Sequence, residues 1–453
     1  MEKPNDSRDE DQLCVDVIDV GQGDSILLKG SDGTTVLVDS GPWYSSDQVL
    51  DHLDNRDINY LDHFVTTHFD ADHIGGHSDV IEAYGSDRIG TVHAPHQEGV
   101  EPPDTKAMNQ FKDSMIENGI KPNQIEEGDS FDLGDAEVDI LNPSQEIDST
   151  DRNENSVVLQ VTQSDNSVLL AGDVEGEAEE RLSGQYPEQL SAVDVAKVPH
   201  HGAENGFGSN SLAHIDSESL IISSSLNNQY YPDENEYDAH PHDEMLERVH
   251  EQVEDSDLYW TPFHGTTSTT IDDDGIQIET ARGERTLSAA DIVALKYYGR
   301  SNDLDNEQLT EIEQIDSADL PEEIPSWAEE SAIVTTDQTV DETTEETATQ
   351  SDEESTRKLP QTDEELFQVV QTYADEKDMS VKEVLQSMQK QAEEAVPATE
   401  TNASEEITEA GEEGIRIREE LRSMTIENGT GMSKSEGTDT HSDTGMEKSL
   451  SDR

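Results

Sequence analysis

Residues 13 to about 290 predict an α/β fold in which helices cover β-sheets. Two observations support this prediction. Short apolar runs separated by Gly and Asp turns recur early in the chain as hairpin strands, and amphipathic helical stretches separate the later strands. A third observation limits it, because the sequence becomes dense in Glu, Asp, Thr and Ser after about residue 295. Sheets covered by helices are therefore expected in the first 295 residues alone.

The elements follow from the local patterns. Runs rich in Val, Ile and Leu, with turn residues at both ends, predict strands over 13–20, 25–29, 35–38, 61–67, 88–94, 136–141, 156–162, 167–171, 193–198, 219–223 and 258–262. Apolar residues at helical spacing predict helices over 46–53, 78–84, 104–118, 175–182 and 244–253. The third of these helices ends at Gly119, a residue typical of helix C-termini.

The remainder of the chain is expected to differ from this domain (1–295). Residues 296–360 predict an acidic disordered linker. Residues 361–392 contain two capping boxes, Thr362 with Glu365 and Ser380 with Glu383, each followed by apolar residues on one helix face. They predict a short αα-hairpin, which is a candidate surface for a protein partner. Residues 393–453 predict an acidic low-complexity tail.

The charge of the chain excludes several classes of protein. Asp and Glu number 106 against 27 Lys and Arg, a net charge of −79, and the acidic residues run through the segments expected to fold. A Lys-poor, acid-rich surface suits molar salt, in which charges are screened beyond about 3 Å. No apolar run approaches the roughly 18–20 residues of a membrane span, and no signal peptide is visible. The single cysteine, Cys14, excludes an internal disulfide, so a halophilic cytoplasmic protein without membrane insertion is expected.

Histidine is concentrated in short motifs that also carry carboxylates. Of 15 His, only His441 lies beyond residue 265. The densest motif is THFDADHIGG (67–76), which follows an expected strand and precedes a helix. Side chains two apart in an extended segment point the same way, so His68 and Asp70 can face one site, while Asp72 and His73 reach a position beside it. Such groups are rarely buried together by chance.

This motif resembles the metal-binding HxHxDH motif of the metallo-β-lactamase superfamily, with Asp70 in place of the second His. Five further segments occur in the order found in the hydrolase domain of ComEC-type DNA-uptake competence proteins and its free-standing relatives. They are VIDVGQGDS (17–25), VLVDSG (36–41), NENSVVL (153–159), LLAGD (169–173) and DVAKVPHHG (194–202). The resemblance covers about residues 13–265 and implies an αββα sandwich with a two-metal site at one edge.

The resemblance also implies a role for individual residues. His68 and Asp70 would lie by one cation, Asp72 and His73 would lie by the other, and Asp173 would bridge them. Because Asp70 supplies a hard oxygen donor, Mn²⁺ is favoured over Zn²⁺.

Other residues would complete and support this site. Either His200 or His201 would complete the second cation's ligands, and the sequence leaves the choice open. His240, in the segment that corresponds to the family's Gly-His-Pro element, would contact a substrate phosphate or orient a ligand from outside. The residues expected to orient the ligands from outside are Asp39, Asn153 and Ser156.

These expectations define a hydrolase that uses a metal-activated water. Asp72 would accept the water's proton or orient the water, and His240 or the other histidine of the 200/201 pair would stabilise developing charge. The resemblance favours a phosphodiester, such as single-stranded DNA or a nucleotide-like diester. The net charge opposes binding of long duplexes, whose affinity rests on basic contacts. Two alternatives remain: a hydrolase of another ester, thioester or lactam, and a non-catalytic binding or regulatory module.

Overall fold

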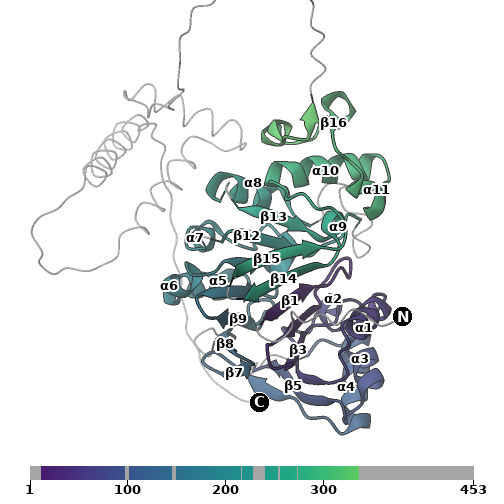
Figure 1. Ribbon diagram of the computed structural model, residues 1–453, viewed down its shortest axis with the longest axis vertical. Coiled ribbons are helices and arrows are strands. Elements are labelled where there is room, and N and C mark those ends of the chain that lie inside the picture. The colour runs from purple at the N-terminus through teal and green to yellow at the C-terminus, as the bar shows by residue number, and fades with distance from the viewer. Residues whose placement is uncertain are drawn as a thin grey trace, which may run out of the picture. The chain divides into compact units, whose positions relative to one another are not determined.

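Two β-sheets pack face to face and carry helices on their outer faces in the computed structural model (Figure 1). The structure describes residues 12–96, 102–144, 149–215, 217–227, 240–253, 256–272 and 274–335. The two stacked sheets with helices outside them confirm the predicted αββα sandwich.

The first sheet has eight strands. Their order is β15 (Gly275–Thr280), β14 (Thr267–Asp272), β1 (Leu13–Val17), β2 (Ile26–Lys29), β3 (Thr35–Val38), β4 (Leu61–Val65), β5 (Ile89–Pro95) and β6 (Asn123–Ile125). Neighbours from β15 to β3 are antiparallel, and those from β3 to β6 are parallel. The accompanying helices are α1 (Ser46–Asn55), α2 (Ala71–Ile74), α3 (His77–Tyr84) and α4 (Lys106–Asn118).

The second sheet has seven strands. Their order is β13 (Asp257–Trp260), β12 (Ser219–Ile222), β11 (Val195–Lys197), β10 (Asn166–Leu170), β9 (Val158–Gln163), β8 (Ala136–Asn142) and β7 (Ser130–Leu133). Strands β10 to β13 run parallel. The helices that accompany this sheet are α5 (Gly176–Gln185), α6 (Pro187–Leu190), η1 (Pro199–Gly202), α7 (Ser209–Leu212), α8 (Asp243–Gln252), α9 (Thr261–His264) and α10 (Ala289–Ser301).

Side chains alternate between the two faces of each strand and form three apolar cores. One core lies between the sheets, and one lies between each sheet and its helices. In β10, Val168 and Leu170 pack between the sheets, whereas Leu169 faces the helices. In β3, Val36 and Val38 likewise point to the inner layer and Leu37 to the helical side. Successive residues of a strand point to opposite faces, so continuous apolar runs are what a sheet buried on both faces requires.

The hairpin of β14 and β15 was not predicted. Its segments are rich in Thr, Ser, Gln and Glu, because only every second residue of β14 is buried and no residue of β15 is fully buried. Pairing of β14 with β1 places this hairpin at the edge of the first sheet.

The prediction of a disordered linker is wrong for residues 296–335. Helix α10 continues to Ser301 and is followed by α11 (Asn306–Thr310), β16 (Ile315–Asp316), η2 (Ser317–Asp319), η3 (Ser326–Glu330) and β17 (Val334–Thr335). Leu309, Ile315 and Ile333 are buried in the core of the second sheet's outer face. These apolar residues are too widely spaced to stand out in an acidic composition, yet each reaches the same core. Residues 336–360, the expected hairpin and the expected tail lie outside the described residues.

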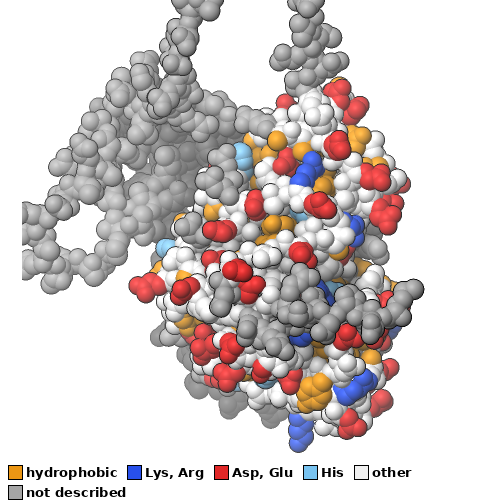
Figure 2. Space-filling model, in the orientation of Figure 1, with side chains coloured by type: hydrophobic (Ala, Val, Ile, Leu, Met, Phe, Trp, Pro, Cys, Tyr) orange, Lys and Arg blue, Asp and Glu red, His pale blue; other side chains and the backbone are white. Residues whose placement is uncertain are grey.

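Acidic side chains are spread over the visible face of the described domain and outnumber the basic ones (Figure 2). Within the part of the chain that the structure describes, no helix combines the length and the apolar content that crossing a bilayer requires.

Candidate metal centre

The predicted site residues lie at the carboxyl ends of strands from both sheets. Asp39 follows β3, the motif 67–73 follows β4, Asp173 follows β10, and His200 and His201 follow β11. Because β3 runs parallel to β4, and β10 to β11, each pair of carboxyl ends meets at one edge of its sheet. Loops at this edge of α/β sheets are where polar groups converge without disturbing the core.

Close backbone approach brings one further carboxylate to this edge. Gly23 has φ +135°, and a Cβ atom there would lie 2.2 Å from the carbonyl oxygen of Asp72. The glycine lets the amide of Asp24 donate to that oxygen at 3.3 Å. The buried Asp24 side chain therefore lies beside the histidine motif.

The hydrogen bonds of Thr67 and Asp39 orient two imidazoles. The Thr67 hydroxyl donates to Asp39 Oδ2 at 2.6 Å, so it can only accept from His68 Nδ1 at 3.1 Å. His73 Nδ1 donates to the same carboxylate oxygen at 2.8 Å. Each ring therefore uses Nδ1 for orientation and leaves the lone pair of Nε2 facing the centre.

His201 is oriented in the same way from the second sheet. Its Nδ1 donates to the carbonyl oxygen of Ser223, which follows β12, at 2.9 Å. His200 and His201 both have positive φ, +49° and +56°. This left-handed turn sends the two adjacent side chains to different places, so His201 enters the centre and His200 does not.

Asp173 is the point on which the three rings converge. Its Oδ2 lies 3.1 Å from His73 Nε2, 3.4 Å from His201 Nε2 and 3.7 Å from His68 Nε2. Among the described residues, the buried atoms His68 Nε2 and Asp173 Oδ1 have no hydrogen-bond partner. Ligand atoms of Asp24, His73, Asp173 and His201 all lie within 4.8 Å of one another, and all four residues are buried.

The carboxylates of this centre require additional positive charge. Burial alone would lower the pKa of His73 and of His201, but the facing Asp173 carboxylate, with Asp39 or Asp24, raises each pKa well above the usual range. Burial would raise the pKa of Asp173, yet the two imidazoles hold it well below the usual range. The carboxylates thus demand positive charge, which a proton or a metal cation can supply.

The residues present fit a divalent cation. Nitrogen lone pairs that face a carboxylate oxygen at 3.1–3.7 Å are unfavourable unless something positive lies between them. Imidazole nitrogen and carboxylate oxygen are also the donors that first-row divalent ions take in proteins.

Asp70, expected beside His68, has two neighbours. Its Oδ2 lies 3.9 Å from His68 Nε2, and its Oδ1 accepts from Arg152 Nε at 2.5 Å. The structure therefore brings Asp70 to the centre but pairs it with an arginine that the sequence did not single out. In a chain this acidic, Arg152 offsets one of several clustered carboxylates.

Asp72 borders the centre from the α2 side. Its Oδ2 lies 3.4 Å from His201 Nε2. Burial would raise its pKa, but His201 and His73 lower it to about 2.

His200 and His240 lie at the rim. His200 Nδ1 pairs with Glu175 Oε2 at 2.8 Å, and its ring stacks on His240 with centroids 5.6 Å apart. His240 Nδ1 lies 3.4 Å from the side-chain amide of Gln22, and burial lowers its pKa to about 2. A neutral His240 that accepts at Nδ1 keeps an N–H at Nε2.

Ser156 lies beneath the Asp173 loop, and Asn153 is bonded to it through the backbone. The Asn153 carbonyl accepts from the amide of Ser156 at 2.9 Å, and the buried Ser156 side chain packs against the backbone of Gly172, where an added Cβ would lie 3.3 Å away. Ser156 therefore packs under the loop rather than entering the centre.

Two central groups were given no role from the sequence. Asp24 receives a short hydrogen bond from Ser223 and a close ion pair from Lys197. Lys197 is fully buried, donates to the carbonyl of Gly172 at 3.2 Å and lies 3.9 Å from Asp173 Oδ1. In the sequence, the only indication for Asp24 or Lys197 is that each lies in one of the segments that resemble the family. The approach of Asp24 to the centre depends on the glycine turn at Gly23, which the sequence pattern does not predict.

Asp39→Asn is expected to weaken binding of divalent cations by about 10–100-fold, since Asn keeps the shape but loses the charge that holds His73. Titration calorimetry with Mn²⁺ measures this effect. Asp62→Asn is the matched control: Asp62 accepts from the Thr35 amide at the opposite end of β4. Equal loss of affinity in both variants would contradict the orienting role of Asp39.

Comparison with known proteins adds an independent finding. A model of the metallo-beta-lactamase superfamily matches residues 18–223. ComE operon protein 3 of Bacillus subtilis is 27% identical over 250 residues, 51% of this chain, and Recombination protein 2 of Haemophilus influenzae is 26% identical over 273 residues, 59% of this chain. The matched segment is 30% of the length of each relative. Among solved structures, the metallo-beta-lactamase fold protein YhfI of Bacillus subtilis has a TM-score of 0.36 at 12% identity, covering 55% of this chain and 96% of that one.

Proposed function

Because a model of the metallo-beta-lactamase superfamily matches residues 18–223, we propose that this protein is a binuclear metal-dependent hydrolase whose substrate is a phosphodiester. The observation that carries the proposal is the convergence of three oriented imidazoles on the buried carboxylate of Asp173.

The ligands divide into two adjoining sets around Asp173. His68 and Asp70 would hold one cation, and Asp72 and His73 would hold the other, with Asp173 between them. His201 would complete the second set, because its Nε2 lies 3.2 Å from His73 Nε2 and 3.4 Å from Asp72 Oδ2. His200 is left outside, bonded to Glu175.

The oxygen-rich donor set favours Mn²⁺ over Zn²⁺. Asp24 is not needed as a ligand in this proposal, since Lys197 already pairs with it. Its role is to fix the position of Lys197 and, through Ser223, the loop that orients His201.

The hydrolytic chemistry follows from these positions. A bound pair of divalent cations would neutralise phosphoryl oxygens and lower the pKa of the attacking water. Asp72, an ionised carboxylate at the border of the centre, accepts or orients the proton of that water. His240 donates from Nε2 to a substrate oxygen, and His200, held at Nδ1 by Glu175, lies beside it to stabilise charge on the leaving side.

The substrate class rests on the competence-protein relatives and on charge. With net −79 and few basic residues near the centre, the chain offers a phosphate backbone little attraction beyond the cations and Arg152. A nucleotide-like diester or a single-stranded DNA end fits this constraint better than a duplex. We place the protein in the cytoplasm, and we keep the C-terminal region as a candidate protein-binding segment.

A substrate panel tests this function. The full chain in molar KCl with Mn²⁺ is expected to hydrolyse bis-p-nitrophenyl phosphate and single-stranded DNA, and to lose this activity in EDTA. Zn²⁺ is expected to restore less activity than Mn²⁺. Turnover of a chromogenic lactam or thioester without diester cleavage would reject the phosphodiesterase and favour another hydrolase of this fold. Turnover of no substrate would favour a binding module.

A further inference from the structure

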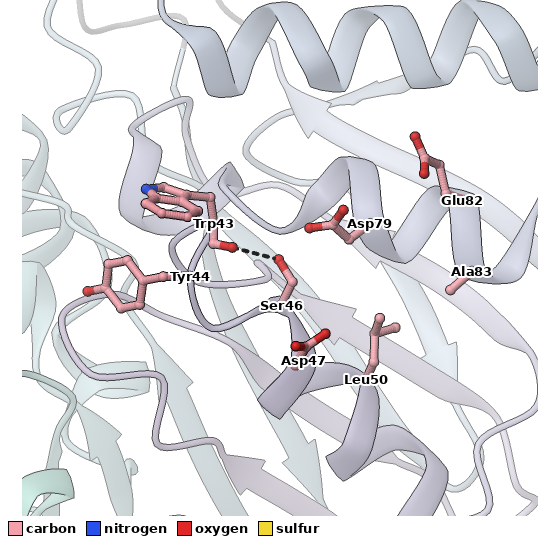
Figure 3. Close-up of a pocket in the computed structure, with 8 residues that line it drawn as sticks. All are labelled: Trp43, Tyr44, Ser46, Asp47, Leu50, Asp79, Glu82 and Ala83. Atoms are coloured by element: carbon pink, nitrogen blue, oxygen red, sulfur yellow. Dashed lines mark hydrogen bonds between the residues drawn. The ribbon is translucent and has the colours of Figure 1, made fainter.

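An aromatic pocket lies next to the candidate metal centre. It has a volume of about 450 Å³ and is formed by the β3–α1 loop, α1 and α3 (Figure 3). Its lining residues are Trp43, Tyr44, Ser46, Asp47, Leu50, Asp79, Glu82 and Ala83. Trp43 is 66% exposed, the most exposed aromatic side chain among the described residues, and it packs edge-on against Tyr44 with centroids 5.8 Å apart. When a flat ring stacks on an exposed Trp, apolar surface of both rings is removed from water, which favours binding.

The same loop touches the metal centre. Gly75 directly follows α2 in the histidine motif, and a Cβ atom there would lie 2.3 Å from the backbone nitrogen of Trp43. The Tyr44 hydroxyl lies 3.8 Å from the Cβ position of Gly21, and the charge of Asp72 contributes with burial to a raised pKa of Tyr44. Tyr44 therefore forms a wall shared by the pocket and the Asp72 side of the centre.

The chemistry of the lining selects a ligand. Asp47, Asp79 and Glu82 offer hydrogen-bond acceptors only, and the pocket contains no basic side chain. A phosphate would be repelled here, whereas a flat ring with N–H donors can stack on Trp43 and donate to these carboxylates. A ligand with a donor-bearing ring at one end and a phosphodiester at the other would have its two ends matched by the pocket and the adjoining centre.

We propose that the Trp43 pocket is a nucleobase subsite, which stacks the base of a nucleotide substrate while its phosphodiester lies at the metal centre. The inference rests on the proposed function and specifies its substrate class. It also answers the charge objection, since stacking is tolerant of base identity and needs no basic groups.

The test measures binding rather than turnover. Titration calorimetry of the full chain with Mn²⁺ in molar KCl compares GMP with ribose 5-phosphate, which carries the same phosphate without the base. GMP is expected to bind roughly tenfold or more tightly. Trp43→Ala is expected to remove that difference, and Trp43→Phe to keep most of it. Tyr60→Ala is the matched control, because Tyr60 is 44% exposed and directly precedes β4, at the end of the strand away from the centre.

Two further measurements separate the competing occupants. Asp47→Asn with Asp79→Asn is expected to weaken GMP severalfold and leave ribose 5-phosphate unchanged. Equal binding of the two ligands, or an unaltered difference in Trp43→Ala, would overturn the proposal. Binding of tetramethylammonium in competition with GMP would assign the pocket to organic cations instead.

The subsite and the proposed function fail differently. Retained GMP selectivity without diester hydrolysis would reject the hydrolase and leave the base subsite standing. Hydrolysis of bis-p-nitrophenyl phosphate without GMP selectivity would reject the subsite and leave the hydrolase standing.

Discussion

Asp173→Ala is expected to abolish hydrolysis of phosphodiesters, lowering kcat/KM by about a thousandfold or more. The carboxylate lies within 4 Å of all three inward Nε2 atoms, so its removal would separate the two sets of ligands. Charge stabilisation by a metal pair is worth several kcal/mol in a transition state, and each 1.36 kcal/mol is about tenfold in rate. Hydrolysis of bis-p-nitrophenyl phosphate at saturating Mn²⁺ measures the loss.

The fold of this variant is expected to survive. Asp173 lies in the loop after β10, outside the three apolar cores, and alanine leaves no buried charge behind. Thermal unfolding followed by circular dichroism checks this, with Asp165→Ala as the control: Asp165 is exposed in the turn at the opposite end of β10. Undiminished turnover in Asp173→Ala would mean that the bridging assignment is wrong.

The proximity of these candidate ligands could be predicted because they follow strands that the sequence indicates. His68 and Asp173 each come three residues after an apolar strand, and His73 lies in the same motif as His68. The carboxyl ends of parallel strands share an edge, so the proximity of these residues is a consequence of topology. The core between the two sheets could be predicted equally well. The continuous apolar runs of β3 and β10 indicate strands that are buried on both faces.

Features that depend on backbone geometry could not be predicted. Adjacency in sequence says nothing about which of His200 and His201 enters the centre, because their left-handed turn decides it. Asp24 reaches the site only through the close approach at Gly23. Trp43 belongs to no motif, and its exposure is a property of the folded loop.

The burial of two lysine side chains is a second feature that the composition does not predict. With only 27 Lys and Arg in the chain, two lysines, Lys197 and Lys296, are fully buried in the described domain. Lys296 of α10 donates to the Pro241 carbonyl at 2.9 Å and pairs closely with Asp243. The helix that the sequence assigned in part to a linker thus anchors the segment that carries His240. Each buried lysine therefore fixes a loop at the rim or the base of the metal centre.

Lys197→Met is expected to lower the free energy of unfolding of the metal-free protein by about 3–5 kcal/mol. Met matches the length of the lysine stem, but it leaves the buried Asp24 carboxylate without its ammonium partner. Breaking one side of a buried ion pair costs this much because the remaining charge stays desolvated. Denaturant unfolding in EDTA measures the loss.

Added Mn²⁺ is expected to recover part of that stability, because a cation that binds only the folded centre stabilises the folded state. Once Lys197 is removed, the Asp24 carboxylate no longer has its ammonium partner and lies within 4.8 Å of the ligand atoms of His73, Asp173 and His201, where a bound cation would offset its charge. Lys106→Met, at the exposed start of α4, should unfold like the parent protein in either condition. An unchanged stability of Lys197→Met in EDTA would show that Asp24 is satisfied by Ser223 and His201 without the lysine. A full loss that Mn²⁺ leaves untouched would instead place the cations away from Asp24, and would make Lys197 a structural counter-ion rather than part of the centre's charge balance.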